Sequence, residues 1–172
     1  MAPARLRLPL PFEQILRRHE REIMGYLLRA SGNRADAADL FQETWLRAYC
    51  AYPRLAPDSR VRPWLYTIAI NLCRNQTRDG RRRAAVIVAD DDARPAAERA
   101  GKLPRAQAEN DGYAAVRLRE LISALPARQR EALQLRCFAG LGYREIAEVM
   151  NCSPQTARAH VSQAQRKLKS LW

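Results

Sequence analysis

Hydrophobic residues recur along this chain at the three- and four-residue intervals of amphipathic helices, and strand-like alternation is almost absent. In one segment the apolar stripe that we expect to face a core consists of Phe41, Trp45, Ala48 and Tyr49. The opposite face of that helix carries Asp39, Gln42, Glu43 and Leu46. The spacing therefore predicts an all-α protein.

A second helix is predicted to begin near Arg62, because Pro63 then lies in the first turn, where a missing N–H costs least. Its buried side is expected to consist of Trp64, Leu65, Ile68, Ala69 and Leu72. Its other face presents Asn71, Arg74, Asn75 and Arg78. We expect the pair Asp79-Gly80 to end this helix, and three arginines at 81–83 follow it.

The last part of the chain has the pattern of a helix-turn-helix. A short helix over 143–150, with Ile146, Ala147 and Met150 inward, is followed by a turn and by a second helix from Pro154 to about Leu168. In the turn Asn151 tolerates a left-handed backbone, Cys152 packs as a small hydrophobe, and Ser153 caps the second helix.

The second of these helices has one buried and one polar face. We expect the buried side to consist of Ala157, Val161, Ala164 and Leu168. The outward positions are Gln155, Arg158, Ala159, Ser162, Gln163 and Arg166. Because Arg and Gln can pair with base edges in the major groove, this helix is predicted to read duplex DNA, with Thr156, Lys167 and Lys169 better suited to phosphate.

Composition divides the chain into two parts. Acidic residues, proline and glycine interrupt an Ala-rich stretch over about 84–112, which predicts a flexible linker between residues 12–83 and 113–172. The chain has 172 residues, enough for one ordinary domain or two very small ones. A single domain with a long surface loop is the alternative to two small domains.

Charge suggests the class of partner. The chain has 30 Lys and Arg against 18 Asp and Glu, a net charge of +12, which favours a polyanion and nucleic acid before an anionic membrane. Residues 1–83 contribute +8, the linker −2 and residues 113–172 +6. Two basic lobes around an acidic tether are typical of a protein that binds a polyanion at two places.

Other classes of function are disfavoured. The longest apolar run, over 84–89, is far shorter than the roughly 18 to 20 residues of a membrane span, and residues 1–11 lack a signal-peptide core, so we expect a cytoplasmic protein. An enzyme acting on nucleic acid is disfavoured because the one acidic cluster, Asp90 to Asp92, lies in the predicted linker. No cofactor or metal site is predicted, since the cysteines form no C-x-x-C pair. We expect all four to be small buried hydrophobes: Cys50, Cys73, Cys137 and Cys152.

The helix that begins near Arg62 has a second kind of nucleic-acid signal. Residues 60–83 hold seven bases and one acid, and arginines that track a backbone stand beside amides that can bind unpaired bases. The candidate contacts are Arg62, Asn71, Arg74, Asn75 and Arg78. Trp64 and Tyr66 could stack on such bases, but we assign them to the core. The acidic face around Asp39 would repel nucleic acid and is interpreted as a protein-docking surface.

Three segments of the sequence resemble the extracytoplasmic-function sigma factors of bacteria. Asp39 to Ala48 (DLFQETWLRA) is similar to the family's polymerase-docking segment, and Arg62 to Asn71 (RPWLYTIAIN) to its promoter-melting helix. Leu125 through Leu168 resembles the fourth sigma region with its helix-turn-helix. The resemblance covers 12–83 and 113–170, about three quarters of the chain.

This resemblance implies two small helical domains, a sigma region 2 bundle and a sigma region 4 helix-turn-helix, joined by a flexible linker. It implies that Asp39, Leu40, Gln42, Glu43 and Leu46 dock on the clamp helices of the largest RNA polymerase subunit. The flap of the second-largest subunit is a further implied contact. Arg62, Asn71, Arg74, Asn75 and Arg78 would meet the minus-ten element, with a flipped base under the loop at about 55–61. Contacts to the minus-thirty-five element would come from Thr156, Arg158, Ala159, Ser162, Gln163 and Arg166.

The resemblance implies a non-enzymatic initiation factor that binds core RNA polymerase and recognises and melts promoter DNA. It further implies an external anti-sigma factor as regulator, a monomer when free, and no membrane contact or cofactor of its own. Relatives often have a hydroxyl residue where Ala159 stands and Arg or Lys at His160 and Gln163, so a polar contact is expected to be missing at Ala159 and the resemblance does not specify the promoter sequence that this helix reads. A stand-alone helix-turn-helix repressor or activator is the alternative, and it would bind duplex DNA without polymerase.

Overall fold

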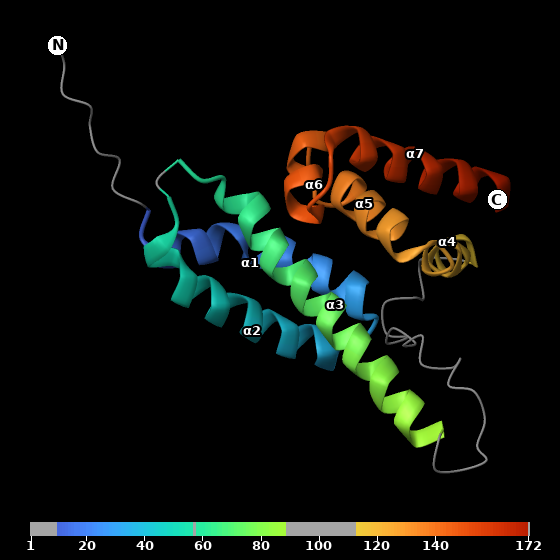
Figure 1. Ribbon diagram of the computed structural model, residues 1–172, viewed down its shortest axis with the longest axis horizontal. Helices are drawn as coiled ribbons and strands as arrows, with labels where there is room; N and C mark the ends of the chain where they lie inside the picture. Colours follow the sequence, from blue (N-terminus) through green and yellow to red (C-terminus); the bar gives the residue numbers. More distant parts are fainter. Residues whose placement is uncertain (1–9, 57, 89–112, 172) are drawn as a thin grey trace.

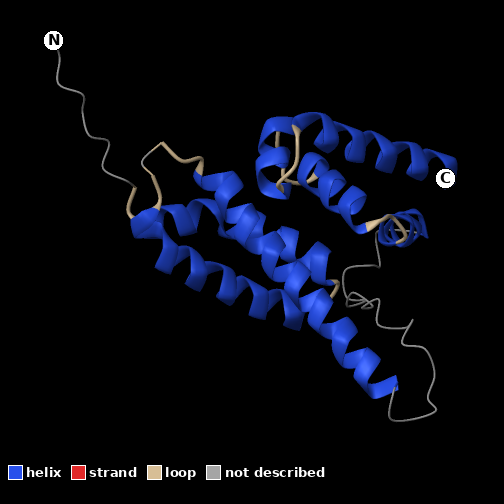
Figure 2. Cartoon of the chain, in the orientation of Figure 1, coloured by secondary structure: helices blue, strands red, loops and turns tan. Residues whose placement is uncertain are grey.

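The computed structural model describes residues 10–56, 58–88 and 113–171, and every regular element in these ranges is a helix (Figures 1 and 2). The first lobe contains α1 (Phe12–Ser31), α2 (Arg34–Ala51), the 3₁₀ turn η1 (Tyr52–Arg54) and α3 (Val61–Val88). The second lobe contains α4 (Tyr113–Ser123), α5 (Ala127–Cys137), α6 (Tyr143–Met150) and α7 (Pro154–Leu171). No helix in the described ranges is both long and apolar enough to cross a membrane.

Local chemistry accounts for the antiparallel pairing of α1 and α2. Gly32 ends α1 in the left-handed region, with φ of 79°, and its N–H donates to Leu28 O at 3.2 Å. The next residue, Asn33, caps α2 by accepting from the Asp36 N–H at 2.8 Å. One residue therefore closes the first helix and the next opens the second, so the connection is very short.

The predicted stripe of α2 is confirmed only in part, at Trp45 and Ala48. The buried residues of this helix are Ala37, Leu40, Thr44, Trp45 and Ala48. Tyr49, which we expected in the core, is 61% exposed, and Phe41 is half-buried. Thr44 is compatible with the core because its hydroxyl donates to Leu40 O at 2.6 Å, leaving no unpaired donor.

The predicted end of α3 is wrong. The helix continues through Asp79 and Gly80 to Val88, and Figure 1 shows it running past the ends of α1 and α2. A single glycine costs only about 1 kcal/mol inside a helix, which is not enough to stop one by itself. The helix thus extends five residues into the predicted linker. The rest of that linker, with Asp90 to Asp92, lies outside the described residues.

The aromatic and cysteine predictions are confirmed only in part. Tyr66 is buried at 1% exposure, with its ring edge-on to Tyr26, whereas Trp64 is half-buried at the margin of the core. Cys73 and Cys152 are half-buried against the core. The prediction of burial is wrong for Cys50 and Cys137, whose side chains are exposed near the ends of α2 and α5.

The two lobes pack against each other, with α3 against α6. Buried side chains of both lobes form one continuous hydrophobic cluster, which extends from Ile15 and Tyr66 in the first lobe to Leu141 and Val161 in the second. A smaller cluster of Leu125, Leu133, Ala164 and the half-buried Leu168 joins α5 to α7. The helix-turn-helix therefore packs against both α5 and α3.

Candidate nucleic-acid interface

The predicted helix-turn-helix is confirmed residue by residue in its turn. α6 ends at Met150, and Asn151 adopts the left-handed region with φ of 51°. The N–H of Cys152 donates to Ala147 O at 3.0 Å, which closes the turn. Ser153 then caps α7 by accepting from the Thr156 N–H at 3.1 Å. Ile146, Ala147 and Met150 of α6 are buried as expected. Their packing helps to hold α7 against α5 and α6.

The outward face of α7 is as predicted. Ala157, Val161 and Ala164 are buried, while the candidate base-reading and phosphate-binding positions are exposed: Gln155, Thr156, Arg158, Ala159, Ser162, Gln163, Arg166, Lys167 and Lys169. These exposed side chains give a polar surface with four cationic side chains and no acidic one. Such a face is chemically suited to a major groove.

Two of these candidates are held by residues that sequence reasoning missed. The Arg158 guanidinium lies 5.2 Å from the centre of the Tyr143 ring, and Arg136 lies 5.1 Å from the same ring. Gln163 accepts a hydrogen bond from the Gln129 amide of α5 at 3.0 Å. The only sequence signal for the first contact is an aromatic residue at the start of α6, which is usually a core position.

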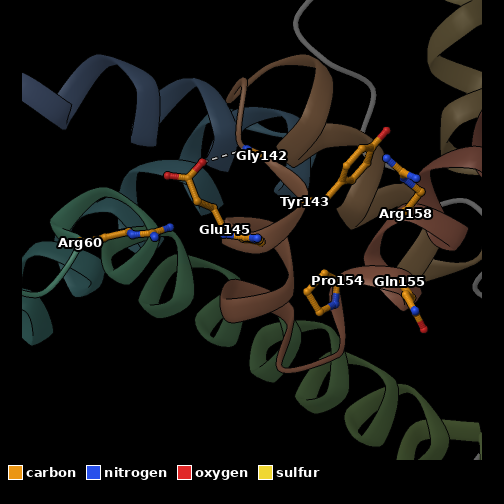
Figure 3. A pocket seen from close by; sticks show the side chains of 8 residues that line it. Arg60, Gly142, Tyr143, Glu145, Pro154, Gln155 and Arg158 are labelled. Atoms are coloured by element: carbon orange, nitrogen blue, oxygen red, sulfur yellow. Dashed lines mark hydrogen bonds between the residues drawn. The ribbon is translucent and has the colours of Figure 1, made fainter.

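A hollow of about 510 Å³ lies between the start of α6, the start of α7 and the loop before α3 (Figure 3). Its lining includes three arginines, Arg60, Arg144 and Arg158. In Figure 3 Arg60 lies on the opposite side of this hollow from Arg158 and Gln155. Arg60 comes from the predicted base-pocket loop, so the structure brings parts of both candidate DNA surfaces to one place.

The candidate minus-ten residues fall into two groups. Asn71, Asn75 and Arg78 are exposed along one side of α3, as their spacing predicts. Arg74 is on the same side but makes a two-pronged ion pair with Glu131 of α5, at 3.0 and 2.7 Å. Arg62 is the second residue of α3 and is bound by Glu22 and by a carbonyl of the second lobe.

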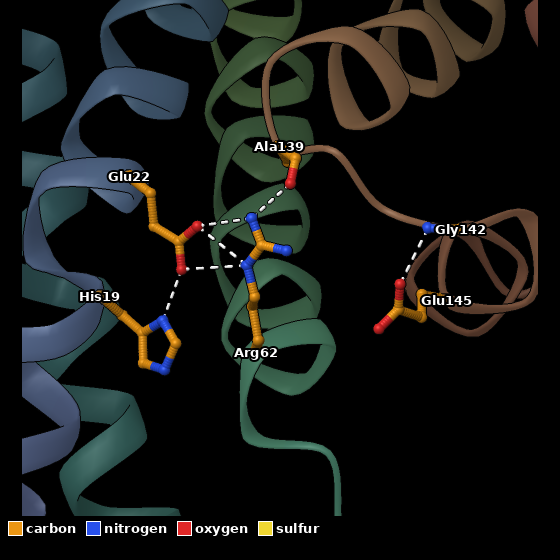
Figure 4. Close-up of polar contacts among 6 residues, drawn as sticks. All are labelled: His19, Glu22, Arg62, Ala139, Gly142 and Glu145. Carbon is orange, nitrogen blue, oxygen red and sulfur yellow. Dashed lines mark hydrogen bonds and ion pairs between the residues drawn. The ribbon is translucent and has the colours of Figure 1, made fainter.

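Arg62 belongs to a chain of polar contacts across three elements (Figure 4). The Glu22 carboxylate accepts from the Arg62 guanidinium at 2.8 and 2.9 Å and also contacts His19. Burial by itself would raise the pKa of Glu22, but the hydrogen bonds from Arg62 and His19 outweigh it and lower that pKa. The hydrogen bond to Glu22 raises the pKa of Arg62, and the same guanidinium donates to the Ala139 carbonyl.

The candidate docking surface on α2 is open, with one exception. Asp39, Gln42 and Leu46 are exposed, and Glu43 is half-buried and ion-paired with Arg47 at 2.6 Å. Leu40, however, is 6% exposed, so its side chain packs in the core and is not part of this surface.

The described residues contain no cluster of three or more His, Cys, Asp or Glu side chains arranged for a metal ion.

Family models match most of the chain. The model described as Sigma-70 region 2 matches residues 15–83, and that described as Sigma-70, region 4 matches residues 115–168. The RNA polymerase sigma factor CarQ of Myxococcus xanthus is 32% identical, over 93% of this chain and 88% of that protein. The ECF RNA polymerase sigma factor EcfG of Rhodopseudomonas palustris is 33% identical, over 87% and 78%.

The fold is similar to that of solved sigma factors. RpoE of Bartonella quintana, crystallised with the anti-sigma factor NepR, matches with a TM-score of 0.73 and 24% identity, covering 93% of this chain and 95% of that one. CnrH, solved with the cytosolic domain of CnrY, matches with a TM-score of 0.68 and 23% identity, covering 93% and 86%. These likenesses confirm the all-α fold.

Proposed function

The chain belongs to the extracytoplasmic-function sigma factors, and from this premise we propose which of its surfaces bind RNA polymerase and which bind promoter DNA. A sigma factor directs core polymerase to promoters and initiates transcription. We assign residues 12–83 as the unit that binds core polymerase and the minus-ten element. Residues 84–112 are assigned as a linker, and residues 113–172 as the unit that binds the minus-thirty-five element.

The observation that carries the assignment of the second unit is the capped, basic recognition helix α7. Asn151 and Ser153 fix its start, and its outward face combines bidentate donors with cations. We propose that Arg158, Ser162 and Gln163 read base edges, that Ala159 contributes an apolar contact, and that Thr156 and Arg166 contact phosphates. Residues of this kind, exposed on one face of a helix-turn-helix, support duplex readout.

The first unit is proposed to act through two separate faces. Asp39, Gln42, Glu43 and Leu46 form the docking face on α2, with clamp helices of the largest polymerase subunit as partner. Leu40 supports that face from the core. On α3, Arg62, Asn71, Arg74, Asn75 and Arg78 are proposed to hold the melted minus-ten strand, with the loop over 55–61 beside a flipped base. A contact of the second unit with the flap of the second-largest subunit completes the proposed assembly.

Regulation and location follow as further parts of the proposal. A solved relative is bound to an anti-sigma factor, and we propose a partner of that class for this chain. The proposed role places no catalytic step on the chain itself, since polymerase makes the phosphodiester bonds. Its site of action is the bacterial cytoplasm, where polymerase and template are found, and it is proposed to be a monomer when free.

Run-off transcription tests this function. Fragmented genomic DNA is transcribed by purified core RNA polymerase with and without the full chain, and every new start site is mapped. We expect starts that require the protein and share two spaced upstream motifs. If no such start appears although the folded protein shifts duplex DNA without polymerase, the initiation role is wrong and a stand-alone repressor or activator replaces it.

A further inference from the structure

The first turn of α5 is bonded to both helices of the helix-turn-helix. The Arg128 guanidinium donates to the last carbonyl of α6 at 3.0 Å. The amide of the next residue, Gln129, donates to Oε1 of Gln163 in α7 at 3.0 Å. One turn after Gln129, Leu133 lies in a buried cluster with Ala164, the neighbour of Gln163. Packing therefore holds the backbone at both ends of the Gln129–Gln163 hydrogen bond.

The buried end of the Gln129 side chain sets the direction of this hydrogen bond. Its Oε1 is buried and has no hydrogen-bond partner in the part of the chain that the structure describes. The reverse orientation of the amide would bury an amino group there, with two unpaired N–H groups in place of one carbonyl. Orphaned buried N–H groups are rarer in proteins than under-satisfied carbonyl groups. Gln129 thus presents its amino group, and not its oxygen, to Gln163.

The contact decides which end of the Gln163 amide faces away from α5. A free glutamine presents an acceptor and a donor, which is why it pairs with N6 and N7 of adenine. Here Oε1 of Gln163 is held on the side of α5, so the Nε2 amino group lies on the opposite side of the same amide. The side chain is exposed on the outward face of α7. The group that leads into a major groove is therefore a pair of N–H donors.

We propose that Gln129 is a positioning residue for promoter readout: by holding the oxygen of Gln163, it makes Gln163 a donor that selects guanine over adenine. Guanine presents two acceptors in the major groove, O6 and N7, whereas adenine presents one acceptor and one donor. The inference rests on the proposed function of α7, in which Gln163 reads a base edge. Gln129 itself is half-buried on α5 and acts only through Gln163.

The test reverses the hydrogen bond while keeping the length of the side chain at position 129. In Gln129→Glu the carboxylate can only accept, so Gln163 must turn its amino group toward α5 and its oxygen toward the groove. The full chain, alone and with core polymerase, selects duplexes from a library in which the minus-thirty-five element is randomised, and the bound duplexes are sequenced. Gln163→Ala identifies the base pair that Gln163 reads. At that pair we expect the preference of wild type for guanine to fall about fivefold to tenfold in Gln129→Glu, while adenine or cytosine, which present amino groups, is gained.

Two further variants separate positioning from added charge and from altered folding. Gln165→Glu adds the same negative charge to an exposed position of α7 that does not face Gln163, because residues two apart on a helix point away from each other. This control should lower affinity for all duplexes alike and keep the guanine preference. Gln129→Met keeps the side-chain length without an amide, so Gln163 is free to turn and its preference should fall without reversing. Circular dichroism checks the helix content of each variant.

Three outcomes overturn the proposal. The first is an unchanged preference in either variant of Gln129 that keeps the wild-type helix content. The second is a wild-type preference for adenine at the base pair that Gln163 reads. The third is a Gln163→Ala chain that selects the same duplexes as wild type, because Gln129 would then have no base contact to position.

Run-off transcription with the same preparations separates this inference from the proposed function. If wild type directs starts but the preference at the base pair of Gln163 does not respond to Gln129, the positioning role is wrong and the initiation role stands. If the chain selects duplexes with a preference that depends on Gln129 but no start appears, the initiation role is wrong and the positioning role stands.

Discussion

Arg158 is held in place both through its backbone and through its side chain. Its backbone lies in the capped first turns of α7, and its guanidinium is stacked beside Tyr143, so less freedom is lost when its fork meets a base. We expect Arg158→Ala to cost about 1 to 3 kcal/mol at a subset of minus-thirty-five positions, measured as promoter affinity of the holoenzyme. Lys169→Ala is the control for a phosphate contact. A uniform loss across all promoter sequences would make Arg158 a phosphate contact too.

Asn151 is the one non-glycine residue with positive φ in the described ranges, and its side chain is exposed. The residue type at position 151 therefore affects stability mainly through the cost of its positive φ. Asn151→Ala should lower the free energy of unfolding by about 1 kcal/mol, because alanine is disfavoured in the left-handed region. Asn151→Gly should be within a few tenths of wild type. Thermal unfolding measures both, and equal losses in the two variants would mean that a side-chain contact, not φ, decides the position.

The cysteines differ sharply in environment. Burial raises the pKa of the Cys73 thiol to about 12, so the reactive thiolate is a very minor form of Cys73 at pH 8. Iodoacetamide should therefore modify the exposed Cys50 and Cys137 first and leave Cys73 unmodified until the chain is denatured. Peptide mass spectrometry assigns the modified positions. Modification of Cys73 at the rate of Cys50 in the folded chain would contradict this burial.

At the scale of elements, the parts that could be predicted from sequence are those set by local chemistry. The turn between α6 and α7 is determined by residues within a few positions of one another, and its cap and left-handed residue were both predictable. The buried stripe of α2 was predicted only at Trp45 and Ala48, since the rest of it depends on how α1 and α3 pack against this helix. Phe12 lies edge-on to Tyr49 at 5.3 Å at the rim, while Leu40 and Thr44 take the interior positions. The spacing of apolar residues along one helix therefore placed Tyr49 in the core although it lies at the rim.

The docking face of α2 can be tested as an element. Gln42→Ala combined with Glu43→Ala should weaken binding to core polymerase and leave helix content unchanged, since neither side chain is buried in the core. Affinity is measured by competition between labelled and unlabelled chains for core enzyme. Because Glu43 is paired with Arg47, the single variant Arg47→Ala is the matched control for loss of that pair. An unchanged affinity in the double variant would remove the docking assignment.

At the scale of the whole molecule, sequence reasoning predicted two basic lobes but not their mutual contact. Arg74 and Glu131 are 57 positions apart, and each alone has an ordinary explanation: a phosphate-binding arginine and a surface acid. Their pairing depends on how α3 meets α5, which no local pattern encodes. The same holds for Arg62, whose predicted DNA role gave no sign of Glu22 or of the Ala139 carbonyl. The positive charge of the first lobe predicted an anionic partner. Glu22 and Glu131 of the same chain neutralise part of that charge.

The link between α1, α3 and the second lobe should make stability depend on pH through Glu22. Its folded-state pKa lies below the ordinary value of 4.5, so the stabilisation is fully present above that value and is lost as the pH falls through the folded-state pKa. The titratable groups that face the carboxylate are Arg62 and His19, both of which favour its charged form, and Tyr66 of α3, whose own pKa Glu22 helps to raise.

We therefore expect Glu22→Gln to lower the melting temperature at pH 7, and the gap from wild type to narrow steadily below about pH 4.5. Thermal unfolding followed by circular dichroism across this range measures the gap. Glu20→Gln is the control, because it removes one negative charge from the same helix without removing the Glu22 carboxylate. If the difference in melting temperature between wild type and Glu22→Gln stays constant as the pH falls, the charge of Glu22 does not stabilise the fold. The Glu22 carboxylate would then not hold Arg62, and with it the second lobe, through its charge.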